Sequence, residues 1–366
     1  MIYNNVFVGK KVLITGNTGF KGSWLSTWLL ACGAEVYGYS INIPTNPSMF
    51  EVLGLNDKIH HYVGNVCEKE RFFDYVSSIK PDFIFHLAAQ PLVSVSYSEP
   101  FETITTNVIG TASVLEAVKR LVDPCVVILI TSDKAYDNVE WIWGYRENDP
   151  LGGKDVYSGS KGAAELVIKS YWHSFIKDLS HIKLGVARAG NVIGGGDWSA
   201  DRIIVDSVKA FHQNQPLELR CPQSTRPWQH VLEPLSGYLC LAQNLYEGKI
   251  PSGEAFNFGP NAEQLKTVLQ LVKDIAFRWG VNGEQIITLK NQQVFEEARL
   301  LKLNCDKSLA YLQWHSVLSY DQTVKLIVDW YMAYYSYKNI DMYDLTLEQI
   351  EFYMSESRKQ NLIWVN

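Results

Sequence analysis

The stretch VLITGNTGFKG, residues 12–22, decides the fold. Val12–Thr15 has the composition of a buried strand, and apolar residues at helical spacing predict a helix over Lys21–Ala31. Between them Gly16 would make the tight turn, Gly19 would let the backbone approach a pyrophosphate, and Gly22 would let the helix pack on the strand. This glycine triplet, followed by the free N–H groups of a helix N-terminus, predicts a dinucleotide-binding turn.

Strands continue to alternate with helices through the first half of the chain. Further strands are predicted at Glu35–Tyr39, Lys58–Val63, Asp82–Phe85, Cys125–Ile130 and Lys183–Ala187. Helices are predicted at Glu68–Ile79, Phe101–Arg120 and Val156–Phe175. This alternation is typical of βαβ units, so we expect an α/β fold with a Rossmann-like, doubly wound parallel sheet. Ligands bind such sheets at the carboxyl ends of the strands.

The pattern changes after Arg188, where strands become short and irregular. Helices are predicted near Ile203–His212, Leu232–Tyr246, Leu265–Arg278 and Thr323–Tyr335. We expect a smaller mixed α/β substrate-binding lobe, mostly residues 188–366, interleaved with an NAD-binding domain of residues 1–187. Segments around 230–260 would return to the first domain, with a strand at Glu254–Asn257 joining the main sheet.

The composition excludes several classes of protein. Apolar residues make up 47% of the 366 residues and charged residues 20%, which is ordinary for a globular chain. With 33 basic and 39 acidic residues the net charge is −6, so we expect no nucleic-acid partner. The longest aliphatic run, Val126–Ile130, is too short to span a membrane, and we see no signal peptide. The six cysteines lack metal-site spacing, so we expect no metal and a cytoplasmic protein.

Tyr157 and Lys161 form the candidate catalytic pair. They lie four residues apart at the start of a predicted helix, so both face the same side. A nearby ammonium favours the phenolate and would lower the pKa of the phenol, giving a base for an alcohol or sugar hydroxyl. Ser132 follows the strand Cys125–Ile130 and would hydrogen-bond the same substrate oxygen.

The end of the second strand leaves the choice of cofactor open. An NAD site commonly has an acidic residue there to bind the ribose hydroxyls. This strand ends in Tyr39-Ser40 with no carboxylate. Ser40 could accept one hydroxyl but would not repel a 2′-phosphate, so this position does not separate NAD from NADP.

Longer strings carry a family resemblance over residues 6 to 340. The glycine turn, Ser132 and the Tyr157/Lys161 pair resemble the extended short-chain dehydrogenase/reductase family. More narrowly, TSDKAYDN (131–138), EWIWGYREN (140–148), AGNVIGGGDW (189–198) and RPWQHVLEPL (226–235) resemble the CDP-glucose 4,6-dehydratases of that family. The resemblance implies NAD as cofactor and CDP-glucose as substrate, in a pathway to dideoxysugars of a surface polysaccharide such as the O-antigen of lipopolysaccharide.

The family's reaction implies a role for each catalytic residue. NAD takes a hydride from C4 of the glucose unit, water is lost across C5 and C6, and the hydride returns to C6. Tyr157, with Lys161 and Ser132, would be the base for the C4 hydroxyl. Asp133 would protonate the departing C6 hydroxyl, and Lys134 would be the base at C5. Related dTDP-glucose and GDP-mannose dehydratases carry Glu at that last position, and a role for Lys134 in bracing the site electrostatically stays open.

The resemblance also implies the binding residues. The cofactor contacts would be Gly16, Thr18, Gly19, Phe20, Gly22, Ser40, Asn65, Val66, Leu87, Ala88, Ala89, Tyr157 and Lys161. The substrate contacts would be Gln90, facing the sugar, and Asn191, Arg202 and Arg226, holding the diphosphate. An ion pair is the alternative for Arg226. The tryptophans Trp141, Trp143, Trp198 and Trp228 would either cover the cleft or fill the core between the lobes.

The resemblance also implies how the protein assembles. Phe101–Arg120 and Val156–Phe175 resemble helices that pair into a four-helix homodimer interface in this family.

A nucleotide-sugar 4-epimerase, or a 4,6-dehydratase for another nucleotide sugar, is the alternative enzyme. The Asp133-Lys134 pair argues against the epimerase, which needs no acid and base for elimination. A dinucleotide-sensing protein without turnover is the alternative from another class, and the activated phenol argues against it.

Overall fold

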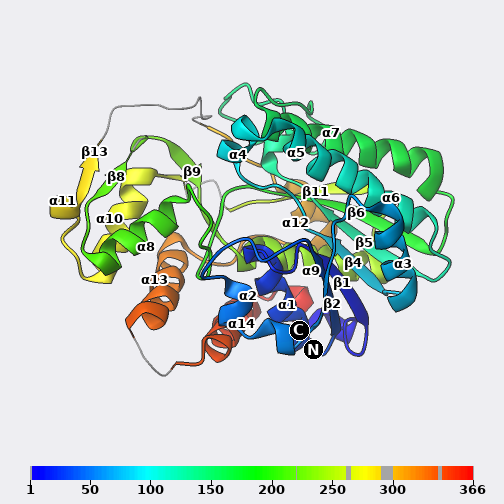
Figure 1. Ribbon diagram of the computed structural model, residues 1–366, viewed down its shortest axis with the longest axis horizontal. Coiled ribbons are helices and arrows are strands. Elements are labelled where there is room, and N and C mark those ends of the chain that lie inside the picture. Colours follow the sequence, from blue (N-terminus) through cyan, green and yellow to red (C-terminus); the bar gives the residue numbers. More distant parts are fainter. Residues whose placement is uncertain (1, 220, 261–264, 290–299, 337–339, 366) are drawn as a thin grey trace.

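A computed structural model describes residues 2–219, 221–260, 265–289, 300–336 and 340–365. Its centre is a seven-stranded sheet whose neighbouring strands are all parallel, in the order β11-β6-β5-β4-β1-β2-β3 (Figure 1). The strands are β1 (Lys11–Thr15), β2 (Glu35–Ser40), β3 (His60–Val63), β4 (Phe83–His86), β5 (Cys125–Ile130), β6 (Ile182–Ala189) and β11 (Glu254–Phe258). The predicted Rossmann-like sheet is confirmed, including the late strand that returns to pair with β6.

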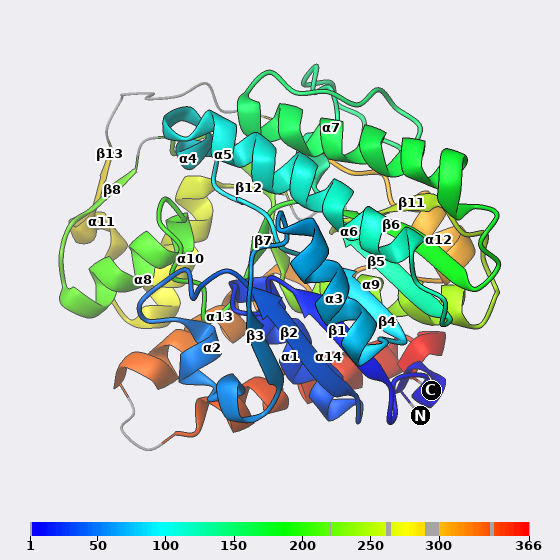
Figure 2. The same cartoon turned by 45° about the vertical axis from the view of Figure 1, so that its right-hand side comes forward.

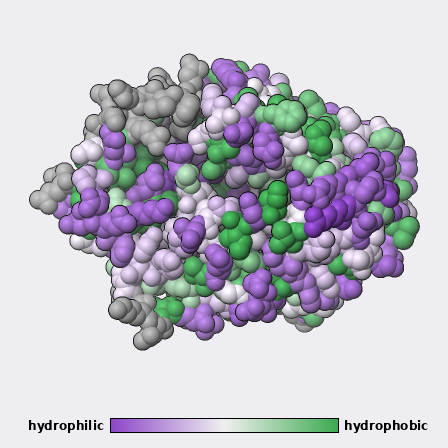
Figure 3. Space-filling model, in the orientation of Figure 1, coloured by the Kyte–Doolittle hydropathy of each residue, from purple (hydrophilic) through white to green (hydrophobic). Residues whose placement is uncertain are grey.

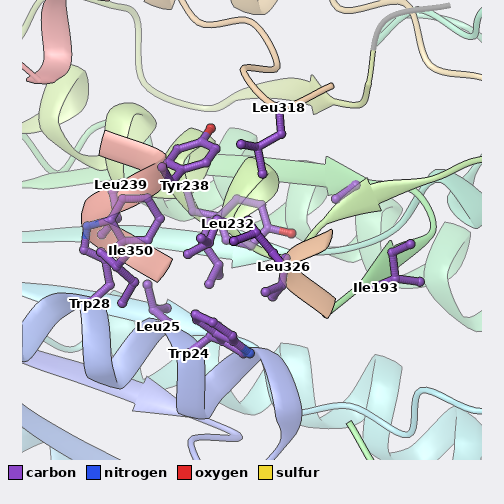
Figure 4. Packing of buried hydrophobic residues seen from close by; sticks show 14 of the residues in the cluster. Trp24, Leu25, Trp28, Ile193, Leu232, Tyr238, Leu239, Leu318, Leu326 and Ile350 are labelled. Atoms are coloured by element: carbon purple, nitrogen blue, oxygen red, sulfur yellow. The ribbon is translucent and has the colours of Figure 1, made fainter. Parts of the chain in front are cut away.

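Helices cover both faces of this sheet. One face carries α3 (Lys69–Ile79), α6 (Gly110–Lys119) and α7 (Val156–Tyr171), and the other carries α1 (Phe20–Ala31), α9 (Leu232–Tyr246) and α14 (Met342–Lys359). Alternate residues of β1 enter different cores: Leu13 packs with the first helix layer, whereas Val12 and Ile14 pack with the second. Figure 4 shows the second core, where Trp24, Leu25 and Trp28 of α1 face α9 and α14.

The second lobe lies beside the carboxyl ends of the main strands. Its longer helices are α8 (Ile203–Gln213), α10 (Val268–Trp279) and α13 (Tyr320–Ser336). Three two-stranded ladders join β7 (Val192–Ile193) to β10 (Gln229–His230), β8 (Leu217–Leu219) to β13 (Ile287–Leu289), and β9 (Thr225–Pro227) to β12 (Leu265–Thr267). Further short helices lie in both halves of the chain. The first half contains α2 (Met49–Val52) and α4 (Val93–Ser98), and the second half contains α11 (Gly283–Ile286) and α12 (Asp306–Leu312). The mixed α/β character of this lobe agrees with the prediction, while the proposed domain limits stay a prediction.

Three predicted helices differ from the structure. The predicted helix Leu265–Arg278 begins only at Val268, because Thr267 caps α10 by accepting a hydrogen bond from the N–H of Gln270. The residues before it, Leu265–Thr267, form strand β12. The predicted helix Phe101–Arg120 consists of α5 (Pro100–Ile104), a π-helical turn (Thr105–Ile109) and α6. The predicted helix Val156–Phe175 is α7 followed by a second π-helical turn, Trp172–Ile176.

The surface is mixed in character. On the face shown in Figure 3, hydrophilic and hydrophobic residues are interspersed. None of the described helices is long and apolar enough to cross a membrane.

Candidate active site

One large cavity contains nearly all the predicted site residues. It has a volume of about 750 Å³, within the range of small-molecule sites, and is lined by residues of the main sheet and of the second lobe. The strand order reverses between β1 and β4, and the turns that follow these two strands both line the cavity. This is the switch point at which doubly wound sheets bind ligands.

The glycine turn after β1 fits a dinucleotide pyrophosphate. Gly16 has a φ of +76°, and a Cβ on it would come within 2.8 Å of the backbone nitrogen of Ala88. A Cβ on Gly22 would lie 2.1 Å from the carbonyl oxygen of Gly16, so the close approach of α1 requires glycine there. A Cβ on Gly19 would meet only one protein atom, at 3.4 Å. The space beside Gly19 is therefore open to a ligand at the N-terminus of α1.

The end of β2 is tied to this turn by hydrogen bonds. The Ser40 hydroxyl donates to Asn17 Oδ1 at 2.7 Å, and the N–H of Thr18 points to Ser40 Oγ at 3.4 Å. The other predicted cofactor contacts also line the cavity: Thr18, Phe20, Ser40, Asn65, Val66, Leu87, Ala88 and Ala89.

The catalytic residues come from two neighbouring elements. Ser132, Asp133 and Lys134 follow β5, where the Ser132 hydroxyl donates to Asp133 Oδ1 at 2.9 Å and accepts the N–H of Lys134 at 3.2 Å. Tyr157 and Lys161 lie in the first turns of α7, which Asp155 caps. The Nζ atoms of Lys134 and of Lys161 each lie 5.9 Å from the centroid of the Tyr157 ring. The structure thus brings all five together around one phenol.

Burial sets the protonation of these groups in the ligand-free protein. It raises the pKa of Tyr157 to about 12, although Arg202 and Ser132 act in the opposite direction. The expected lowering of the pKa of this phenol is therefore not seen in the ligand-free protein, because desolvation outweighs the effects of Arg202 and Ser132. Burial also lowers the pKa of Lys161 to about 8, opposed by the charge of Glu165.

Asp133 is suited to act as an acid. Burial raises the pKa of its carboxyl above the usual value, against the effects of Lys134 and of the Ser132 hydroxyl. A carboxyl in such surroundings keeps its proton to higher pH and can deliver it to a leaving hydroxyl.

A buried network lies behind the catalytic segment, and we call its members Thr131, Tyr136, Glu165, Arg188 and Asn257 the rear network. Arg188 donates from Nε and Nη2 to the two carboxylate oxygens of Glu165, at 2.7 and 2.6 Å. Its Nη1 donates to Tyr136 Oη at 2.7 Å, and this hydroxyl donates to Asn257 Oδ1 at 2.7 Å. Thr131 also donates to Glu165. The network therefore joins the catalytic segment to α7, β6 and β11.

Three of the four predicted substrate contacts lie at the cavity, and their role in binding stays a prediction. Asn191, Arg202 and Arg226 line the cavity. Gln90 does not, contrary to the expectation, because its amide donates to Leu92 O and Thr103 Oγ1 and accepts the N–H of Leu92. The hydrogen bonds of its amide are satisfied by Leu92 of its own loop and by Thr103 of α5.

Only two of the four tryptophans take one of the two expected positions. Trp228 is buried and lines the cavity, whereas Trp198 packs in an aromatic cluster with Trp330 and does not line it. Trp143 is 67% exposed and contacts the ring of Trp141.

Three residues were missed by the sequence reasoning. Lys21 and Asp197 line the cavity beside the catalytic groups. The Asn107 side chain, in the first π-helical turn, bonds the backbone of Gln90 and the hydroxyl of Ser160, which joins the cofactor loop to α7. A lysine in the first turn of a helix is unusual enough to have drawn attention to Lys21.

Comparisons with known proteins agree with this geometry. The family model for GDP-mannose 4,6 dehydratase matches residues 13–327. A CDP-glucose 4,6-dehydratase from Salmonella typhimurium is 47% identical over 335 residues, covering 90% of this chain and 93% of the relative.

Two solved structures share the fold. A dTDP-glucose 4,6-dehydratase from Bacillus anthracis in complex with NAD has a TM-score of 0.74, 22% identity and coverage of 88% of this chain and 96% of that one. A UDP-glucose 4-epimerase from Thermotoga maritima with UDP-glucose has a TM-score of 0.73, 23% identity and coverage of 87% and 97%. The fold alone therefore does not separate dehydratase from epimerase. The family match and the Salmonella relative show that the chain belongs to the GDP-mannose 4,6-dehydratase family, within the extended short-chain dehydrogenases/reductases.

Proposed function

We propose that this protein is an NAD-dependent CDP-glucose 4,6-dehydratase, which converts CDP-D-glucose into CDP-4-keto-6-deoxy-D-glucose and water. The observation that carries the proposal is the placement of Asp133 and Lys134 beside Tyr157 in one cavity. An elimination needs an acid and a base in addition to the base for C4 oxidation, and this cavity offers all three. CDP-glucose is favoured among nucleotide sugars by the 47% identity to the Salmonella enzyme.

NAD, held over the glycine turn of Gly16, Gly19 and Gly22, would supply the hydride chemistry needed at C4 and C6 of the sugar. The chain's own residues handle the protons. Tyr157 accepts the proton of the C4 hydroxyl, to which the Ser132 hydroxyl also hydrogen-bonds. The charge of Lys161 reduces the cost of the phenolate, which is otherwise high for a phenol with a pKa of about 12.

Elimination follows from the acidity that a C4 ketone gives to C5. Asp133, whose pKa burial raises above its usual value, donates its proton to the C6 hydroxyl as it leaves. The resulting carboxylate is stabilised by the Ser132 hydroxyl and by Lys134. Lys134 removes the C5 proton with its amine nitrogen and returns it when the product forms. Asn191, Arg202 and Arg226 bind the diphosphate.

A panel of nucleotide sugars tests this function. The protein is incubated with NAD and each of CDP-, dTDP-, UDP- and GDP-hexoses, and the products are analysed by mass spectrometry and alkaline absorbance. Loss of one water from CDP-glucose alone is expected. Inversion at C4 without loss of water would replace the proposal by an epimerase, and water loss from another nucleotide sugar would change the substrate. NAD binding without turnover of any sugar would favour the sensor.

We also propose that the protein is a homodimer through the helices α5, α6 and α7, which run side by side in Figure 2. Outward apolar side chains on these helices support the proposal, since Phe101 is 80% exposed and Leu166 55% exposed. Light scattering should give twice the monomer mass, and Phe101→Glu with Leu166→Glu should give the monomer. A wild-type monomer at micromolar concentration would contradict this assembly.

A cytoplasmic role in dideoxysugar synthesis, for example for an O-antigen, is part of the same proposal. The six unpaired cysteines support a reducing compartment.

A further inference from the structure

The ammonium of Lys21 lies at a position where the surrounding structure does little to stabilise a positive charge. It is the second residue of α1, and the positive end of the helix dipole disfavours a lysine in this first turn. Its side chain is partly buried and lines the cavity, together with the glycine turn on one side and Arg202 on the other.

The charges around Lys21 do not neutralise it. Arg202 and Lys161 repel its ammonium, while Asp133 and Asp197 attract it. No described residue forms an ion pair with it. Burial, followed by Arg202, lowers the pKa of Lys21 to about 8, so most of the molecules keep the charge at neutral pH. The ligand-free protein thus carries an uncompensated positive charge that faces the cavity.

We propose that Lys21 is a phosphate-binding residue of this site, whose ammonium contacts a diphosphate oxygen of NAD or of the sugar nucleotide. The inference rests on the proposed function, because both ligands of that reaction bring a diphosphate into this cavity. An anion is the group that an unpaired ammonium beside helix N–H groups and Arg202 would bind. Lys21 supplies a point charge there, in addition to the backbone N–H groups of the glycine turn.

The proposal predicts opposite effects on the free and the loaded protein. Lys21→Met removes a charge that the ligand-free protein does not neutralise, so its melting temperature without ligand should be equal or higher. The same variant should gain less thermal stability from a diphosphate ligand than the wild type does. A merely structural lysine would lower the melting temperature with and without ligand.

Calorimetric titrations with NAD alone and with CDP alone identify the diphosphate. Lys21→Met should raise the dissociation constant of one of the two ligands by about tenfold or more, as expected for the loss of a charged hydrogen bond. Weaker NAD binding assigns Lys21 to the cofactor, and weaker CDP binding assigns it to the sugar nucleotide. Lys21→Arg keeps the charge and should retain most of the affinity. Lys69→Met is the matched control, since Lys69 begins α3 and does not line the cavity.

Two results would overturn the proposal. One is an unchanged dissociation constant for both NAD and CDP in Lys21→Met. The other is a loss of turnover with normal binding of both, which would give Lys21 a part in proton transfer instead. A wild-type protein that binds NAD but does not dehydrate CDP-glucose would refute the proposed function, while its NAD titration would still decide the role of Lys21.

Discussion

Behind the catalytic segment, the charges of Glu165 and Arg188 are buried and bonded to each other through two hydrogen bonds. In front of it, Lys21, Lys134 and Lys161 line the cavity, and none of the three forms an ion pair with a described residue. Both regions hold charge away from bulk water, which is costly in either place. The difference is that the rear charges are satisfied by the fold, whereas the front charges are left for a ligand. Variants of the rear network should therefore affect folding, and variants of the front groups should affect binding and chemistry.

The largest effect is expected at the phenol between the two regions. Tyr157→Phe removes the proton acceptor for the C4 hydroxyl and should slow C4 oxidation by about a thousandfold or more. The melting temperature should stay close to that of the wild type, since no hydrogen bond of the Tyr157 hydroxyl supports the rear network. Single-turnover measurements with CDP-glucose give the rate. Oxidation at a rate close to wild type would remove Tyr157 from the base role.

A large effect on stability is expected in the rear network. Arg188→Met leaves the buried Glu165 carboxylate without its cation and should reduce the free energy of unfolding by roughly 3–5 kcal/mol. The double variant Glu165→Met/Arg188→Met removes both charges, so it should lose less than Arg188→Met alone. Urea unfolding of the three proteins measures the coupling. Additive losses would mean that the two charges are not a unit.

The next variant, at Lys134 in the cavity, distinguishes oxidation at C4 from elimination across C5 and C6. Lys134→Ala removes the proposed C5 base and should reduce exchange of the C5 proton with deuterated solvent by about tenfold or more. C4 oxidation should remain measurable. Normal C5 exchange in this variant, followed by NMR, would leave Lys134 with an electrostatic role only.

The last effect is a change of stability with pH and concerns Glu233, a buried carboxyl that is bonded to the N–H groups of Val317 and Leu318 and to the Tyr353 hydroxyl. Burial raises its pKa to about 7, so the folded state binds the proton more tightly than the unfolded chain does. This stabilisation is complete below the unfolded pKa and is lost as the pH rises through the folded pKa of about 7, a total change of roughly 3 kcal/mol. Unfolding measured between pH 5 and 8 should show it, and Glu233→Gln should flatten it. A wild-type stability that does not fall over this range would contradict the assignment.

The sequence predicted the features that local pattern determines. The strand Cys125–Ile130 has the predicted bounds, and the glycine turn lies where its spacing placed it, because the positive φ of Gly16 and the contact of Gly22 with Gly16 are set within the turn itself. Ser132, Asp133 and Tyr157, which the family strings single out, line one cavity, while their catalytic roles stay predictions.

What the sequence could not predict depends on long-range packing. The partners Glu165 and Arg188 are brought together by the contact of α7 with β6, and no local pattern pairs them. Gln90 turned away because Thr103 and Leu92 satisfy its amide. The pKa of Tyr157 follows from burial, which the spacing of Tyr157 and Lys161 does not reveal.

The hydrogen at C4 of the substrate tests most directly whether one site performs both oxidation and elimination. CDP-glucose that carries deuterium at C4 is incubated with the protein and NAD, and the product is analysed by NMR and mass spectrometry. If one site performs both oxidation and elimination, the product has lost water and carries the deuterium at C6. Deuterium that stays at C4, or that is released to the solvent, would contradict the account.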